Sequence, residues 1–188
     1  MGRWEPNARG RLEQAALELY GERGYDRTTV TEIATRAGVT ERTYFRHFAD
    51  KREVLFGGSA GLQDLMVAAL AEVPASAPPI DVVAAALDAL DVVFRDRRDH
   101  ARRRQMVIDA NAELRERELV KLASLATVLA GALRERGVAE PAASLAAEAG
   151  IAVFRVAFDR WIADTHERGM SEHLHEGLAE LRRVTAGE

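Results

Sequence analysis

Cysteine is absent from this chain of 188 residues, which excludes disulfide bonds, thiolate metal ligands and a cysteine nucleophile. Aromatic residues make up only 6% of the sequence, and there are five prolines. No apolar run approaches the roughly 18 residues that a membrane-spanning helix needs. The N-terminal sequence MGRWEPNARGR also lacks the apolar core of a signal peptide. We therefore expect a cytoplasmic protein without a membrane partner.

Alanine, leucine and charged residues dominate the composition instead. The chain is 47% apolar and 30% charged, which is typical of a soluble globular protein. Alanine and leucine favour helix, and no stretch shows the sustained two-residue alternation of β-branched side chains that marks a strand. The composition therefore predicts an all-α fold.

The charge of the chain is unevenly distributed. The net charge is −4 overall, but the segment from Arg36 to Arg52 contains five basic and two acidic residues, a local charge of +3. The sign of a local patch decides whether a polyanion can bind there, more than the total charge does. The acidic composition therefore does not exclude nucleic acid as a partner.

Three short helices are predicted at the N-terminus. Apolar residues at helical spacing indicate the first one: Leu12, Ala15, Ala16 and Leu19. Gly24 ends it, and Thr29 with Glu32 forms the capping-box pattern that begins a second helix. Gly38 ends that helix, and Thr40 caps a third almost at once. Two short helices joined by a glycine turn predict a helix-turn-helix.

The third predicted helix contains residues that suit the DNA major groove. Arg42 near its N-terminal end can bind the O6 and N7 atoms of guanine, and Glu41 can accept a hydrogen bond from the amine of cytosine. Phe45 and Phe48 are three residues apart and are predicted to face the core. Hydroxyl groups, flanking cations and helix starts supply the expected phosphate ligands: Thr29, Thr40, Thr43, Tyr44, His47 and Lys51.

The segment after the third helix predicts a long helix with an interruption. We expect it to begin near Asp50 or Lys51 and to run to about Val73. The glycines in Gly57–Gly61 indicate either close packing with a later helix start or a hinge between two domains. Pro74–Pro79 is the clearest linker in the chain.

Further helices are predicted after this linker, the first from about Ile80 to Arg95. The cluster from Arg95 to Arg104 contains six arginines and two aspartates. It is interpreted as a solvated helix end with local ion pairs, or as a contact to DNA or to the preceding long helix. His173 and His175 cannot place both rings on one helix face, so we expect no metal site and no cofactor.

The segment TTVTEIATRAGVTERTYFRHFADKREVL, residues 28–55, resembles the N-terminal DNA-binding domain of the TetR family of transcriptional regulators. The resemblance covers about residues 8–56, and its matching pieces are Thr29-Val30 before Ile33-Ala34, Ala37-Gly38-Val39, Thr43, His47-Phe48 and Lys51. Phe45 departs from the pattern, because the family most often has a phosphate-binding tyrosine there. We include Phe45 in the predicted interface by its position, although its ring carries no hydroxyl.

The resemblance implies a homodimer of about nine helices per chain. It assigns residues 1–50 to helix-turn-helix DNA binding and residues 51–188 to ligand binding and dimerisation, and it implies a palindromic double-stranded operator as partner. The implied small-molecule pocket includes Met66, Phe94, Met106, Leu122, Leu125, Phe154, Phe158 and Trp161. The implied dimer interface includes Phe154, Phe158, Ile162, Leu174, Leu178 and Leu181.

Three classes of function differ in the sequence features that they require. A ligand-responsive regulator, most often a repressor in such a family, requires both the helix-turn-helix and a pocket. An architectural DNA-binding protein requires only the first. An enzyme is not expected, because the chain contains no nucleophile elbow, phosphate-binding loop or metal-spaced His-Glu motif.

Overall fold

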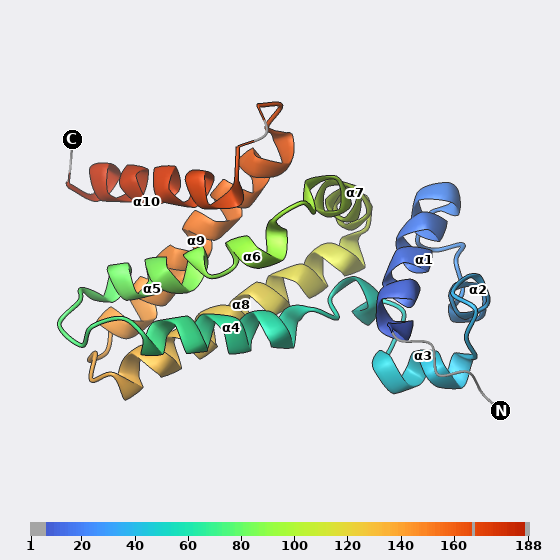
Figure 1. The fold of residues 1–188 in the computed structure, drawn as a ribbon, viewed down its shortest axis with the longest axis horizontal. Helices are drawn as coiled ribbons and strands as arrows, with labels where there is room; N and C mark the ends of the chain where they lie inside the picture. The colour runs from blue at the N-terminus through green and yellow to red at the C-terminus, as the bar shows by residue number, and fades with distance from the viewer. Residues whose placement is uncertain (1–6, 167, 187–188) are drawn as a thin grey trace. The chain divides into compact units, whose positions relative to one another are not determined.

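The computed structural model describes residues 7–166 and 168–186, and within these ranges all regular secondary structure is helical, which confirms the predicted all-α fold. The helices in chain order are α1 (Ala8–Arg23), α2 (Val30–Arg36), α3 (Glu41–His47), the 3-10 helix η1 (Glu53–Leu55), α4 (Ser59–Ala71), α5 (Pro79–Asp88), α6 (Asp91–Phe94), α7 (Arg98–Asp109), α8 (Ala112–Glu135), α9 (Ala142–Ala163) and α10 (Met170–Ala186) (Figure 1). The stretch expected as one helix from Ile80 to Arg95 is divided into α5 and α6.

The chain folds into two compact units. The N-terminal unit contains the residues up to Gly58 together with Arg103–Leu119, and the C-terminal unit contains Ser59–Arg102 together with the residues from Val120 onward. The N-terminal unit is therefore built from two separate pieces of the chain. The division into a DNA-binding part, 1–50, and a ligand and dimer part, 51–188, concerns function and stays a prediction.

The caps predicted at the N-terminus are present. Thr29 caps α2, and its capping box with Glu32 is complete on both sides. Thr40 caps α3 by accepting a hydrogen bond from the backbone N–H of Thr43. Between the two helices, Gly38 has a φ of 68°, a left-handed conformation that glycine adopts without a steric penalty. The two caps and the glycine turn therefore determine where α2 and α3 begin and end, and they produce the helix-turn-helix.

The core of the N-terminal unit joins both pieces of its chain. Leu12 and Leu19 of α1, Ile33 of α2 and Ile108 of α7 are all buried in it, as are further side chains from α3, η1 and α8: Tyr44, Phe48, Val54, Leu55 and Leu114. Burial of apolar surface is the main stabilising term of such a small unit. The segment from Arg103 to Leu119 thus completes a core that residues 7–58 begin.

Phe45 does not face this core, which corrects the prediction for the two phenylalanines of α3. Phe45 is 54% exposed, whereas its neighbour Tyr44 is fully buried. Successive residues of a helix are rotated by about 100°, so adjacent side chains cannot share one face. The buried face of α3 is formed by Tyr44 and Phe48, which are one helical turn apart.

The long helix expected from residue 50 begins later. Only η1 is helical before Gly57 and Gly58, and α4 starts at Ser59. The stretch Glu53–Ala71 has the length and apolar composition of a possible membrane span. A single stretch of this kind is weak evidence, because core helices of soluble proteins have the same composition, and Met66 and Leu70 of α4 are buried in the core of the C-terminal unit.

Gly57 is expected to be required for close packing. A β-carbon at this position would lie 2.7 Å from Cε1 of the buried Phe48, 2.8 Å from Nη2 of Arg9 and 2.9 Å from Oε1 of Glu13. Gly57→Ala should therefore lower the free energy of unfolding by about 1–3 kcal/mol through overpacking. Gly58→Ala is the matched control, because no atom lies within 4 Å of its added carbon. Equal midpoints of urea unfolding for the two variants would contradict this expectation.

The C-terminal unit is a layered arrangement of longer helices. Within it α9 packs against both α5 and α10, and α5 packs against α4 (Figure 1). Its core contains the following buried residues from these helices and α8: Met66, Leu70, Val83, Leu87, Leu129, Leu133, Ala147, Ile151, Trp161 and Leu174. The linker from Pro74 ends where Pro79 begins α5, and Gly137, with a φ of 86°, follows the end of α8.

Candidate nucleic-acid interface

Helix α3 presents an exposed cationic and aromatic face. Arg42, Phe45, Arg46 and His47 are exposed on it. Arg42 and Arg46 form no hydrogen bond or ion pair with any residue that the structure describes, so both guanidinium groups are available to an external anion. Residues one turn apart lie on the same side of a helix, and this places Arg46 beside Arg42.

Arg46 is a candidate that the sequence reasoning missed. Its spacing of four residues from Arg42 on a predicted amphipathic helix was the signal that could have identified it. The local charge of +3 describes the segment as a whole and does not distinguish paired from unpaired cations. In the structure, Arg42 and Arg46 are unpaired among the described residues, whereas the other cations of the segment are bound within the protein.

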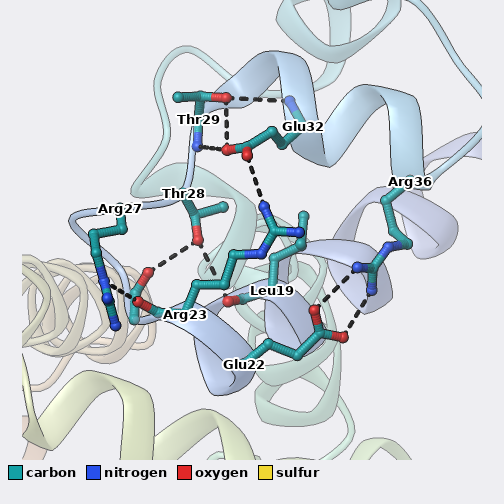
Figure 2. Close-up of polar contacts among 9 residues, drawn as sticks. Leu19, Glu22, Arg23, Arg27, Thr28, Thr29, Glu32 and Arg36 are labelled. Atoms are coloured by element: carbon teal, nitrogen blue, oxygen red, sulfur yellow. Dashed lines mark hydrogen bonds and ion pairs between the residues drawn. The ribbon is translucent and has the colours of Figure 1, made fainter.

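The other cations of the segment are bound within the protein. Arg36 donates to both carboxylate oxygens of Glu22 at 3.0 Å (Figure 2). Arg52 binds the carboxylate of Asp50, with an Nη2–Oδ2 distance of 2.7 Å. These groups contribute to the field around α3, but their first partners are carboxylates of the same chain.

Lys51 is also bound inside the N-terminal unit, and its assignment as a phosphate ligand stays a prediction. Its Nζ donates to the backbone oxygens of Tyr25 and Thr28, at 2.9 and 3.2 Å, and lies 4.0 Å from the centre of the Tyr25 ring. The lysine therefore holds the loop between α1 and α2. The backbone N–H groups of the next two residues, Arg52 and Glu53, both donate to Oδ1 of Asp50, so these two donors are already paired within the chain.

Tyr44 cannot reach a phosphate, because it is fully buried, and this corrects its assignment as a phosphate ligand. Its hydroxyl donates a hydrogen bond to the backbone oxygen of Asp50 at 3.1 Å. Burial raises the pKa of this hydroxyl, and the nearby Asp50 carboxylate adds to the effect. Tyr44 is a neutral core residue that connects α3 to the loop after it.

The start of α2 is occupied by a carboxylate of the chain itself. The N–H of Thr29 donates to Oε2 of Glu32 at 2.8 Å, and Arg23 binds the other carboxylate oxygen at 2.8 Å (Figure 2). The hydrogen bonds from Thr29 are the first cause of a lowered pKa of Glu32, so the carboxylate is charged at neutral pH. A phosphate at Thr29 would have to lie beside this carboxylate.

The remaining predicted contacts lie at the N-terminal end of α3. Thr40 and Thr43 place their Oγ1 atoms 3.1 Å apart. Glu41 is exposed and accepts a hydrogen bond from the hydroxyl of Thr31 in α2. This contact fixes the direction of the carboxylate and joins the two helices of the motif.

Four of the predicted pocket residues come together in the C-terminal unit. The ring centres of Phe94 and Phe158, and of Phe94 and Trp161, are 5.7 and 5.5 Å apart, and Phe154 lies 6.0 Å from Phe94. Arg98 lies over the Trp161 ring at 5.6 Å. We call these four rings the aromatic cluster. Edge-to-face and stacked arrangements of this kind suit an apolar ligand as well as an ordinary core.

Met106 does not belong with these residues, which corrects its assignment to the pocket. It lies in the part of α7 that belongs to the N-terminal unit, and it is 65% exposed. Met66 and Leu125 are buried core side chains, and Leu122 is partly buried beside them.

The predicted dimer residues are also only partly available. Leu174 and Leu178 are buried in the core of their own unit, so they cannot contact a second chain in this conformation. Phe154, Phe158, Ile162 and Leu181 are partly buried. The apolar residues that α9 and α10 do expose were missed: Leu145, Val156 and Val184.

The two histidines of α10 are bound to different carboxylates. His173 is buried and its Nε2 lies 2.9 Å from Oδ2 of Asp164, whereas the exposed His175 has its Nε2 2.9 Å from Oδ2 of Asp88. Asp164 also accepts hydrogen bonds from the N–H of His166, the first cause of its strongly lowered pKa, and from Arg168. The two imidazoles therefore have separate structural roles.

Comparisons with known proteins agree with this geometry. Residues 13–56 match the family model "Bacterial regulatory proteins, tetR family", and residues 77–186 match the "MftR C-terminal domain". The HTH-type transcriptional regulator TcmR of Streptomyces glaucescens is 39% identical over 88 residues, which are 47% of this chain and 39% of TcmR. The chain thus aligns with less than half the length of the curated relatives it matches.

Solved structures extend the similarity to nearly the whole chain. FadR of Thermus thermophilus, a TetR-family repressor solved with lauroyl-CoA, is 27% identical with a TM-score of 0.56, and 93% of each chain is covered. FadR of Bacillus subtilis, solved with stearoyl-CoA, is 20% identical with a TM-score of 0.63, covering 92% of this chain and 96% of the other, and supports the fold. With family models matched over both halves of the sequence, the chain belongs to the TetR family of bacterial transcriptional regulators.

Proposed function

We propose that the protein is a cytoplasmic, homodimeric repressor that binds a palindromic operator and is released by a small-molecule ligand. The observation that carries the DNA half is the exposed face of α3, where Arg42, Phe45 and Arg46 stand on a helix capped by Thr40 directly after the Gly38 turn. A helix of this kind enters the major groove with its N-terminal residues toward the base edges. We infer that the role of α3 is to bind DNA and that the protein is not an enzyme.

Dimerisation is proposed because one three-helix reader contacts only half a site. A two-fold dimer doubles the contacts and places the two recognition helices about 34 Å apart in successive major grooves. The exposed Leu145 and Val156 on α9 and Val184 on α10 are candidate contacts between copies. The partly buried Phe154, Phe158, Ile162 and Leu181 are further candidate contacts between copies.

The ligand half of the proposal rests on the aromatic cluster. Its rings supply an apolar surface in the C-terminal unit, with the Arg98 guanidinium over Trp161 as a cationic group beside it. Because the similar FadR of Thermus thermophilus was solved with lauroyl-CoA, this thioester is the first compound to test. A ligand can lower operator affinity only by its differential affinity for the two conformations of the protein.

Arg42→Ala is expected to weaken operator binding by about 1–3 kcal/mol and to relax the base preference at one position in each half-site. Arg46→Ala is the comparison, because a phosphate contact should weaken all sequences alike and reduce the dependence of binding on salt. Fluorescence anisotropy with the operator and single-base variants measures both effects. The assignment of Arg42 to base reading would be wrong if the two variants lost affinity equally on every sequence.

The operator sequence would be identified by a DNA-affinity selection on the source genome, with the Arg42→Ala/Arg46→Ala protein as the control. Recovery of a palindromic site by the wild type alone, at two chains per site, supports the homodimeric regulator. Release from that site by lauroyl-CoA supports the ligand half. An architectural DNA-binding protein, the alternative, would keep the site but release it for no ligand.

A further inference from the structure

A groove lies within the N-terminal unit, away from the face of α3. It has a volume of about 600 Å³ and is formed by residues 17–27, at the end of α1 and in the loop after it, and by residues 103–111, at the end of α7. Binding sites for small molecules in proteins have volumes of about 300–1,000 Å³. The groove is therefore large enough for a small organic ligand, and it does not involve the aromatic cluster.

The lining of the groove is largely apolar. Leu17, Tyr20 and Tyr25 contribute buried side chains, and the ring centres of the two tyrosines are 5.2 Å apart in an edge-to-face arrangement. Met106 of α7 also lines the groove, and 65% of its surface is exposed. Methionine is flexible and polarisable, so it adapts to the shape of an aromatic or aliphatic ligand.

The charged groups along the groove favour an anion. Three arginines line it, Arg23, Arg27 and Arg103, against a single carboxylate, Asp26. The lining therefore carries a formal charge of +2. Guanidinium groups bind carboxylates and related anions through paired hydrogen bonds of fixed geometry.

Arg23 can turn to such an anion at little cost. Its present partner, Glu32, is 2.8 Å away, but the side chains of both residues are exposed, by 49% and 38%. Exposed ion pairs contribute only about 0–1 kcal/mol. Glu32 would keep its hydrogen bonds to the N–H and hydroxyl of Thr29 after losing the arginine (Figure 2).

Arg27 is already positioned by the backbone. Its Nε donates to the backbone oxygen of Arg23 at 2.7 Å, next to the hydrogen bond from the Thr28 hydroxyl to the oxygen of Gly24 at 2.9 Å (Figure 2). This arrangement restricts the side chain before any ligand arrives. A restricted cation loses less entropy on binding than a mobile one.

We propose that this groove is a second ligand site, which takes a small amphipathic organic anion: an apolar or aromatic body against Tyr20, Tyr25 and Met106, and a carboxylate or similar group at Arg23 and Arg27. The site is separate from the ligand site proposed in the C-terminal unit. It is also adjacent to the capping box of α2, so an occupant would contact the residues that support the helix-turn-helix.

The methionines make the two sites distinguishable in one experiment. The full-length protein would be labelled with ¹³C at the methionine methyl groups and titrated with 2-naphthoate, with the neutral 2-naphthamide as the control ligand. Met106 lines the groove, whereas Met66 and Met170 are buried in the core of the C-terminal unit. We expect the Met106 signal to shift in a saturable way, and we expect the amide to bind about tenfold more weakly because it lacks the charge.

A pair of variants tests the location. Ala110→Trp should fill the groove and abolish the Met106 shift, whereas Ala112→Trp, just outside the lining, should leave it unchanged. An unmoved Met106 signal in the wild type, or equal affinities for naphthoate and naphthamide, would overturn the proposal. Shifts of Met66 and Met170 alone would also overturn it while supporting the ligand site in the C-terminal unit.

Discussion

Replacing Tyr44 by alanine is expected to lower the free energy of unfolding by about 3–5 kcal/mol, the range for deleting a fully buried aromatic side chain. Tyr44 is fully buried and is among the largest fully buried side chains of the protein. Its ring contacts the rings of Phe45 and Phe48, with centres 5.5 and 5.4 Å apart. The cavity left by alanine would lie where α3 packs against the rest of the N-terminal unit, so operator binding should fall with the folded fraction. Urea unfolding followed by circular dichroism measures the change.

Two companion variants separate packing from hydrogen bonding and from surface effects. Tyr44→Phe removes only the hydrogen bond to the backbone oxygen of Asp50 and should cost about 1 kcal/mol. Phe45→Ala should change stability by less than about 0.5 kcal/mol, because Phe45 is exposed. If Phe45→Ala were as destabilising as Tyr44→Ala, the assignment of Tyr44 to the core and of Phe45 to the surface would be wrong.

The local part of this unit was predictable from the sequence. Thr29 with Glu32, Gly38 and Thr40 determine where α2 and α3 begin and end through contacts within a few residues of the chain. The choice between Tyr44 and Phe45 as core residue was not predictable in the same way. Adjacent aromatics on a short helix are equivalent in pattern, and the face that becomes buried depends on α1 and on the segment that contains Ile108 and Leu114.

The contacts of Lys51 and the position of Met106 were not predictable from the sequence for the same physical reason. Lys51 binds carbonyl oxygens 26 and 23 residues earlier in the chain, and Met106 lies in a helix whose second half packs on the N-terminal core. No local pattern encodes such partners. The family resemblance assigned Lys51 to phosphate by its place in a motif and Met106 to a pocket by its place after the linker, and neither argument includes long-range contacts.

Several residues of the arginine cluster from Arg95 to Arg104 bind backbone oxygens of other segments. Arg98 and Arg102 donate to backbone oxygens at the end of α9, with Arg102 bound to Ile162 at 2.7 Å. Arg104 donates to the backbone oxygen of Leu55 at 2.8 Å, within the N-terminal unit. The interpretation as a solvated helix end is therefore wrong for Arg98 and Arg104, whereas Arg102 is partly exposed and also forms a local ion pair with Asp99. Carbonyl oxygens left unpaired near helix ends are their partners.

Arg104→Met is expected to lower the free energy of unfolding by about 2–3 kcal/mol, the cost of removing a charged donor from partly buried partners. The guanidinium binds the oxygen of Leu55, lies 3.2 Å from Glu118 and stands 4.9 Å from the centre of the Phe56 ring. Burial lowers the pKa of Arg104, and the carboxylate of Glu118 opposes that shift. Removing the arginine would leave the carbonyl and the carboxylate without this cation, although Gln105 still donates to Glu118 at 3.1 Å.

A double-mutant cycle with Glu118→Gln isolates the ion pair from the hydrogen bond to Leu55. Because the carboxylate left by Arg104→Met is partly buried, neutralising it should recover about 1 kcal/mol, and the two substitutions together should cost less than their sum. Arg104→Lys keeps the charge but cannot supply both donors in the same geometry, so it should fall between the wild type and Arg104→Met. Additive losses in the cycle would show that Arg104 stabilises the N-terminal unit through Leu55 and Phe56 alone, without a contribution from Glu118.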